Sequence, residues 1–250
     1  MKKLRYFLEI SYKGTRYHGW QIQPNAITVQ EVLNKALSTL LGETVDTLGS
    51  GRTDTGVHAS VQVVHFDTEK ELKDSFLLSI NALLPKDVSI QWIRAVNDDA
   101  HARFDATKRS YVYKIALQKN PFDQELVWFY RGQPDVELMN RAAALLLTHT
   151  DFQCFSKVHT EVNNFNCTIT KAYWEQNGTS LHFHITANRF LRGMVRAIVG
   201  TLIEVGKGKC TIEEFEKILV EKDRNKAGMA APPEGLYLCE VSYPETIFKS

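Results

Sequence analysis

The chain has 250 residues, of which 44% are hydrophobic and 24% are charged, a composition typical of a folded protein with a sizeable core. Thirty Lys and Arg residues against 29 Asp and Glu residues give a formal charge of +1, so the chain lacks the overall basic balance common among nucleic-acid-binding proteins. No stretch approaches the roughly 18 apolar residues of a membrane helix, and the N-terminal apolar run is too short for a signal peptide, so we expect a cytoplasmic protein without membrane segments.

The first half of the chain alternates between strand and helix patterns. Apolar residues at every second position predict strands, and apolar spacings of three and four predict helices. Thr28 and Glu31 form a capping-box pattern before the first helix, Gly42 follows its end, and Pro85 ends the second helix. In chain order we predict a strand at 5–12, a helix at 29–40, strands at 45–48 and 61–68, a helix at 76–84 and a strand at 88–96.

The second half repeats this order as a pattern, without clear sequence identity to the first. Asn177-Gly178 is a hairpin turn signal between two of its strands. We predict a strand at 110–117, a helix at 136–147, strands at 169–175 and 181–187, helices at 191–205 and 212–220, and a strand at 237–243. Because β-α-β-β-α-β is the ferredoxin-like order, we predict an α+β protein of two ferredoxin-like halves, residues 1–105 and 106–250, whose antiparallel sheets join across a central catalytic cleft.

Cysteines and histidines do not follow a metal-binding pattern. The four cysteines are Cys154, Cys167, Cys210 and Cys239. Their spacing contains no C-x-x-C pair, so we interpret them as reduced and mostly buried thiols. The histidines near them are His149, His159, His182 and His184. Because their spacing to the cysteines fits no zinc template, we predict no metal site.

Residues 49–59 hold the densest group of residues that could carry chemistry. Three glycines, Arg52, Asp54 and His58 lie between two predicted strands. A phosphate-binding loop is one interpretation, because Gly51 and Gly56 have the spacing of its glycines. Val57 and His58 stand where that loop needs Lys and Ser or Thr, which disfavours it.

An aspartic protease is a second interpretation of the same segment, because Asp54-Thr55-Gly56 is the triplet that those enzymes carry. They need two carboxylates that share one proton, whereas the triplet occurs once in this chain and the predicted helices do not suit an all-β fold. A third interpretation is a turn-forming Asp beside Gly that only binds backbone amides.

Residues 51–59 as a unit resemble the signature of the tRNA pseudouridine synthase A (TruA) family, whose common form has Ala at the position of Thr55. Further matches follow in the order of the family: Tyr17-His18-Gly19-Trp20-Gln21, Val29-Gln30-Glu31, His101-Ala102-Arg103-Phe104, Tyr111-Val112-Tyr113, Met194-Val195-Arg196 with Gly200, and Gly235-Leu236-Tyr237-Leu238. One departure is Cys167, where members commonly have Arg, which puts one RNA-facing contact in doubt.

The resemblance implies an enzyme that isomerises uridine to pseudouridine in the tRNA anticodon stem-loop, at positions 38, 39 and 40. It also implies a homodimer that grips one tRNA across both subunits. The reaction moves the bond to ribose from uracil N1 to C5 without oxidation, so we expect no cofactor. A catalytically inactive RNA-binding module with a similar fold is the rival interpretation.

By resemblance, Asp54 is the catalytic carboxylate, acting as nucleophile or base; whether it first attacks the ribose or abstracts a proton stays open. Arg196, on the flank of the apolar stripe of its predicted helix, would keep that carboxylate ionised. Tyr111 matches the tyrosine that packs on the target uracil, whereas Tyr113, on the same face of the predicted strand, is interpreted as a core tyrosine.

Arg52 would enter the place that a flipped-out base leaves, or grip a phosphate. His58 we interpret as structural. Basic residues that gather with aromatic ones around 103–114 and 189–196 would supply a local RNA-binding groove despite the near-neutral total charge.

Overall fold

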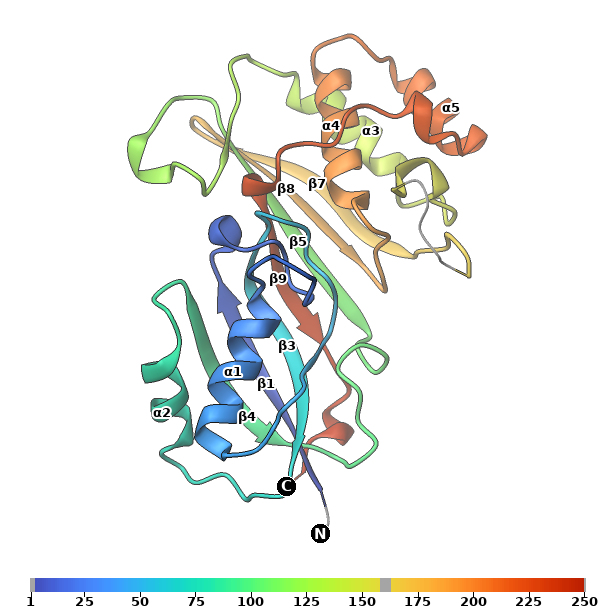
Figure 1. Ribbon diagram of the computed structural model, residues 1–250. Coiled ribbons are helices and arrows are strands. Elements are labelled where there is room, and N and C mark those ends of the chain that lie inside the picture. The colour runs from blue at the N-terminus through green and yellow to red at the C-terminus, as the bar shows by residue number, and fades with distance from the viewer. Residues whose placement is uncertain (1–2, 158–162, 250) are drawn as a thin grey trace. The chain divides into compact units, whose positions relative to one another are not determined.

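The computed structural model describes residues 3–157 and 163–249. These divide into two compact units, which are described separately: a first unit of the residues up to 108 together with those from 237 onwards, and a second unit of residues 109–236. None of the helices in the described ranges has the length and apolar character needed to span a membrane. The elements alternate between helices and mostly antiparallel strands, which confirms the predicted α+β class (Figure 1).

The sheet of the first unit is built around β1 (Leu4–Tyr12). That strand lies between β3 (His58–Thr68) and β4 (Val88–Ala95) and is antiparallel to both. The short strand β2 (Leu48–Gly49) pairs antiparallel with one end of β3, and β9 (Leu236–Ser242) pairs parallel with the other end, at His58 and Ala59. The predicted order of elements up to residue 96 is thus confirmed.

The predicted strand at 45–48 is wrong except at its last residue. The backbone before β2 bonds to side chains of the preceding helix instead of to a strand: Val45 N donates to Ser38 Oγ at 2.9 Å, and Thr47 N donates to Asn34 Oδ1 at 3.2 Å. Side chains of that helix therefore satisfy the backbone nitrogens of this segment in place of a neighbouring strand.

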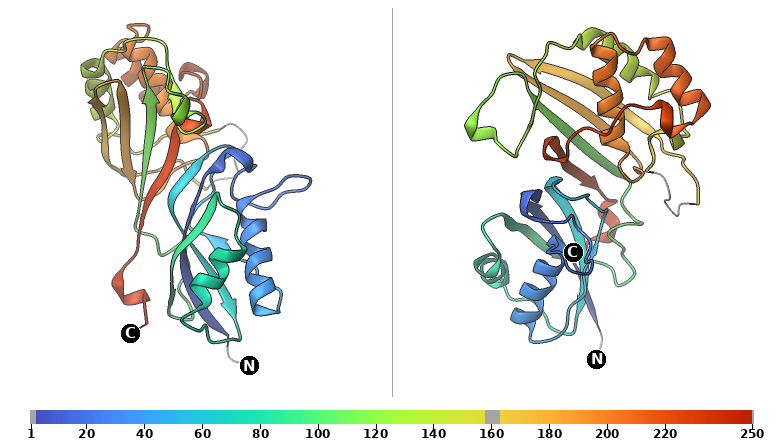
Figure 2. Two further views of the ribbon diagram at one scale, coloured as in Figure 1. Left: turned by 90° about the vertical axis from the view of Figure 1, so that its left-hand side faces the viewer. Right: turned by 45° about the horizontal axis from the view of Figure 1, so that its top comes forward.

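Two helices cover one face of this sheet (Figure 2). Helix α1 (Val29–Leu41) begins where Thr28 Oγ1 accepts a hydrogen bond from Glu31 N, and it ends at Gly42, whose φ of 64° is left-handed, as the capping pattern predicts. Helix α2 (Phe76–Leu83) is joined to β4 by Asn81, whose amide bonds to both N and O of Ile90 at 2.8 Å.

The C-terminal residues belong to the core of the first unit. Ile247 and Phe248 pack with Phe7 of β1 and Val63 of β3, and β9 pairs with β3. The sequence division placed residues 237–250 in the second half. The sequence could not predict that these residues group with the first unit, because pairing between residues almost 180 positions apart leaves no local pattern.

The second unit has its own antiparallel strands. β8 (Ser180–Ala187) lies between β5 (Lys108–Ala116) and β7 (Ile169–Asn177), and the turn between β7 and β8 contains Gly178 with φ of 59°, as the hairpin signal predicts. A two-residue strand, β6 (Trp128–Phe129), runs parallel to the end of β5. It is too short to show a periodic pattern and was not predicted.

Three helices complete the second unit: α3 (Val136–Leu145), α4 (Met194–Gly206) and α5 (Ile212–Glu221). Asp135 caps α3, and Thr211 with Glu214 forms a full capping box on α5. The predicted start of α4 at residue 191 is wrong, because Gly193 takes a left-handed conformation with φ of 72° and the helix begins after it. Short 3-10 helices occur at Gly14–Arg16, Pro121–Asp123, Gln153–Phe155, Arg224–Lys226, Pro233–Gly235 and Glu245–Ile247.

Candidate active site

Asp54 lies, half-buried, in the loop between β2 and β3. Hydrogen bonds fix the backbone on both sides of it. Trp20 N donates to Thr53 O at 3.1 Å, Gly56 N donates to Tyr17 O at 3.3 Å, and Val57 N donates to Asp54 O at 3.1 Å. The carboxylate is therefore carried by a backbone that residues 17–20 hold in place.

Two glycines allow this close approach. A Cβ at Gly19 would lie 2.4 Å from Thr53 O, and the φ of Gly19, +85°, is itself unfavourable for other residues. A Cβ at Gly14 would lie 1.9 Å from Val57 O. The two matching segments of the sequence, at 17–21 and at 51–59, are thus one packed structural unit.

Buried polar side chains support the loop from beneath. The Tyr12 hydroxyl donates to Gln62 Oε1 at 2.7 Å and lies 2.8 Å from Thr53 Oγ1. Because a phenol has one proton to give, Thr53 must donate in the second bond. The Gln62 amide in turn donates to Gly51 O at 3.3 Å. Of the two neighbours of Arg52, Gly51 is therefore bonded to β3 and Thr53 is bonded to β1.

His58 and Arg52 have opposite environments. His58 is buried, its Nδ1 accepts a hydrogen bond from Gly14 N at 2.9 Å, and its ring stacks on that of Tyr237 at 4.6 Å. These contacts match the structural interpretation of His58. The Arg52 side chain is exposed, as a residue that meets RNA must be.

In the second unit, Tyr111 and Tyr113 lie on the same face of β5 but differ in burial. Tyr111 is half-buried, and its ring meets the edge of Phe190 at 5.1 Å. Tyr113 is fully buried, and its hydroxyl donates to Pro232 O at 2.7 Å. Burial raises the pKa of Tyr113. Tyr113 is thus the core residue of the pair, and Tyr111 is the more exposed of the two.

Arg196 lies in the first turn of α4 and is half-buried, whereas Arg192 before the helix is exposed. Arg196 Nε donates to Ala231 O at 2.6 Å, and Ala231 N donates to Arg196 O at 2.9 Å. Sequence reasoning missed Ala231 as a partner. The signal that could have pointed to it is the rigid run Ala231-Pro232-Pro233 near the end of the chain.

The cysteines and histidines show no metal centre: among the described residues, no group of three or more His, Cys, Asp or Glu side chains is placed to hold an ion. His159 lies outside the described residues. Burial lowers the pKa of His182 and of His184, and the His184 ring stacks on Tyr173 at 4.8 Å. Burial also raises the pKa of Cys154 to about 12.

Cys167 is 1% exposed, and burial raises the pKa of its thiol to about 11. Its backbone N donates to Thr150 O at 2.8 Å. The side chain at this position therefore points into the protein in this chain, and Cys167 offers no surface to RNA.

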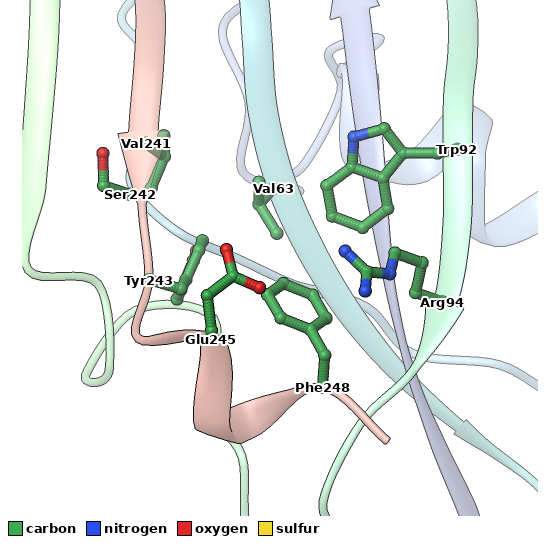
Figure 3. A pocket seen from close by; sticks show the side chains of 8 residues that line it. All are labelled: Val63, Trp92, Arg94, Val241, Ser242, Tyr243, Glu245 and Phe248. Atoms are coloured by element: carbon green, nitrogen blue, oxygen red, sulfur yellow. The ribbon is translucent and has the colours of Figure 1, made fainter. Parts of the chain in front are cut away.

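A pocket of about 400 Å³ in the first unit is lined by residues outside the Asp54 loop (Figure 3). Its lining residues include Trp92, Arg94 and Phe248, with the Arg94 guanidinium stacked over the Phe248 ring at 4.2 Å. All of the lining residues are in the described part of the chain, and Asp54 and Arg52 are not among them. We therefore assign this pocket no part in the site.

Comparison with known proteins identifies the family. The family model described as tRNA pseudouridine synthase matches residues 10–105 and 142–244. The tRNA pseudouridine synthase A of Bacteroides thetaiotaomicron is 51% identical over 98% of this chain and 92% of its own length. The enzyme of Parabacteroides distasonis is 48% identical over 98% of this chain and 98% of its own length. The enzyme of Colwellia psychrerythraea is 43% identical over 97% of this chain and 95% of its own length.

These matches confirm the resemblance that the motifs indicate, and they set aside the phosphate-loop and aspartic-protease interpretations of residues 49–59. The Asp54 loop lies within the first matched range, and Arg196 lies within the second. The chain therefore belongs to the tRNA pseudouridine synthase family and is an isomerase of that type.

Proposed function

We propose that this enzyme converts uridine to pseudouridine in the anticodon stem-loop of tRNA, at positions 38, 39 and 40, with Asp54 as the catalytic nucleophile or base. The observation that carries the proposal is the half-buried carboxylate of Asp54 on a loop whose backbone residues 17–20 fix. A group that forms or breaks bonds must be held near its reactive position, and a fixed backbone achieves this.

The chemistry requires few groups from the protein. The bond between ribose C1′ and uracil N1 breaks, the uracil turns, and a bond forms between C1′ and C5. The proton on C5 then leaves, and N1, which is no longer bonded to ribose, gains a proton. Product and substrate have the same composition, so no electrons are gained or lost. A carboxylate that serves as nucleophile or base can bring about these steps, and we therefore propose that no cofactor is needed.

The other site residues would act around the flipped uridine. We assign Tyr111, which a ligand can reach beside Phe190, to stacking on the uracil. Arg196 would act on the substrate or on the Asp54 carboxylate through its positive charge. Arg52, exposed two residues before Asp54, would fill the place of the flipped base or bind a phosphate.

We further propose that the two halves are ferredoxin-like, that their sheets join across a central catalytic cleft, and that a cytoplasmic homodimer binds one tRNA. The pairing order β4-β1-β3-β2 in the first unit supports the first of these points. Identity to curated tRNA pseudouridine synthases over nearly the whole chain supports tRNA as the partner.

The test is tritium release from tRNA labelled at uridine C5, with purified protein and no added cofactor. Release is expected, and it should disappear for transcripts in which uridines 38, 39 and 40 are replaced by cytidine. Intact tRNA binding without release would point to the inactive RNA-binding module instead. Release from the substituted transcripts would contradict the proposed positions.

A further inference from the structure

We infer that residues 228–232, here called the strap, position the Arg196 side chain for the reaction, and that Gly200 and Thr201 of α4 are positioning residues because they hold the strap. This inference rests on the proposed function, since it assigns the strap a part in the work of Arg196. All of the contacts that support it lie within the second unit.

The strap runs directly across α4. A Cβ at Gly200 would lie 1.8 Å from Met229 O, and a Cβ at Gly228 would lie 3.0 Å from Thr201 Cα. Two facing glycines therefore allow the main chain of the strap to touch the helix without an intervening side chain. Any larger residue at position 200 would push the strap away.

Hydrogen bonds tie the strap at both of its ends. Thr201 Oγ1 accepts from Gly228 N at 2.9 Å and donates to Ala197 O at 2.7 Å. At the far end, the Tyr113 hydroxyl donates to Pro232 O at 2.7 Å. The strap thus spans from α4 to β5, the strand that also carries Tyr111.

Between these two ends, the strap forms hydrogen bonds with Arg196 itself. Ala231 N donates to Arg196 O at 2.9 Å, and Arg196 Nε donates to Ala231 O at 2.6 Å. The second bond restrains the direction of the Nε–H and so limits the orientations of the guanidinium. The two terminal nitrogens form another edge, which can match a carboxylate or phosphate in a two-point contact.

An arginine has many rotamers in solution, and each one lost on binding costs free energy. A guanidinium that is already fixed by Ala231 avoids this cost at the moment of reaction. The strap therefore contributes to the rate through the orientation of Arg196, while the strap itself supplies only main-chain atoms to that task.

The test variant is Thr201→Val, which keeps the shape of the side chain but loses the acceptor for Gly228 N. A methyl group at Gly200 would displace the strap outright, so the milder change is preferred. Thr201→Ser, which retains the hydroxyl, is the conservative control. Asp135→Ala, which removes the N-cap of α3, controls for a general loss of stability.

Two quantities are measured in each protein. The first is the exchange rate of the Arg196 Nε–H with water, from its NMR signal, identified by its loss in Arg196→Lys. The second is the single-turnover rate of tritium release from labelled tRNA, with tRNA affinity measured in parallel. In Thr201→Val we expect faster Nε–H exchange and turnover about tenfold slower, at unchanged tRNA affinity. Both controls should resemble the wild type.

The inference is overturned if Thr201→Val turns over at the wild-type rate, if its Nε–H stays protected, or if Asp135→Ala slows turnover equally. A wild-type protein that releases no tritium would instead contradict the proposed function. In that case the NMR measurement still decides whether the strap holds Arg196. The two failures are therefore distinguishable.

Discussion

The backbone nitrogen of Trp20 donates a hydrogen bond of 3.1 Å to the carbonyl oxygen of Thr53, the residue before Asp54. The Trp20 carbonyl in turn accepts from Gln30 N at 3.0 Å, in the first turn of α1. The Asp54 loop is thus coupled through one residue to the start of a helix. Its geometry depends on that helix as much as on its own sequence.

Gly19→Ala should disturb this coupling. The new methyl group would lie 2.4 Å from Thr53 O, at a backbone φ of +85°, so we expect the free energy of unfolding to fall by about 2 kcal/mol or more. Tritium release should slow as the loop shifts. Chemical denaturation measures the stability.

The matched control for that change is Gly51→Ala in the same loop. A Cβ there would meet no atom of the described residues within 4 Å, and the φ of Gly51 is not positive. The free energy of unfolding should therefore change by less than about 0.5 kcal/mol. Equal losses in both variants would show that residues 17–20 do not constrain the loop.

Asp54→Asn should abolish turnover while folding and tRNA binding stay close to those of the wild type. The amide has the shape of the carboxylate but can act neither as nucleophile nor as base. Tritium release and gel-shift affinity on the same preparation check this prediction. Residual activity within about tenfold of the wild type would mean that another group carries the chemistry.

The two tyrosines of β5 should respond differently to loss of the hydroxyl. Tyr111→Phe keeps the ring and should bind tRNA normally. If the hydroxyl also moves a proton, as we expect because a proton must leave C5, its turnover should fall about 10²–10⁴-fold. Tyr111→Ala should also lose stacking, worth about 1–3 kcal/mol. Single-turnover kinetics and binding separate the two roles.

Tyr113→Phe is the comparison for Tyr111. It removes the bond to Pro232 O and should lower the free energy of unfolding by about 1 kcal/mol. Because that bond also ties the strap to β5, we expect turnover to slow by up to about tenfold, as in Thr201→Val. If Tyr111→Phe slows turnover no more than this, the Tyr111 hydroxyl has no special part in proton transfer. Tyr111 is then a stacking platform.

His65 should make stability depend on pH. It is 3% exposed, and burial, with a contribution from His101, lowers its pKa to about 4 in the folded protein. The unfolded state binds a proton at this side chain below a pH of about 6.5. Between these values the unfolded state holds more protons, so stability is lost as the pH falls from about 6.5 towards 4, by up to about 3 kcal/mol.

The comparison for this effect is His65→Asn, which keeps an acceptor for Ala102 N, the donor to His65 Nδ1 at 3.1 Å. Urea unfolding at several pH values between 4 and 7 should give a flatter stability profile for the variant. His182 and His184 of the second unit also have lowered pKa values and contribute equally to both proteins. Parallel profiles would contradict the assignment to His65.

The sequence by itself determined the local elements and the chemistry. Thr28 marks a helix start in the sequence because the bond that caps a helix involves a neighbour three residues away. The Asp54 loop was identified from its own residues, because a family signature is a run of consecutive positions. The strand predicted at residues 45–47 was wrong, because side chains of α1 accept the backbone hydrogen bonds that a neighbouring strand would otherwise accept.

Only the tertiary structure decided between residues with the same local pattern. Tyr111 and Tyr113 share one face of a strand, and the proximity of Pro232 and Gly235 is what buries Tyr113. Arg196 Nε donates to the carbonyl of Ala231, 35 positions later. The grouping of β9 with β3 likewise depends on pairing between distant segments. Such contacts form because folding brings remote backbone groups together to satisfy their hydrogen bonds, and periodicity along the chain does not record them.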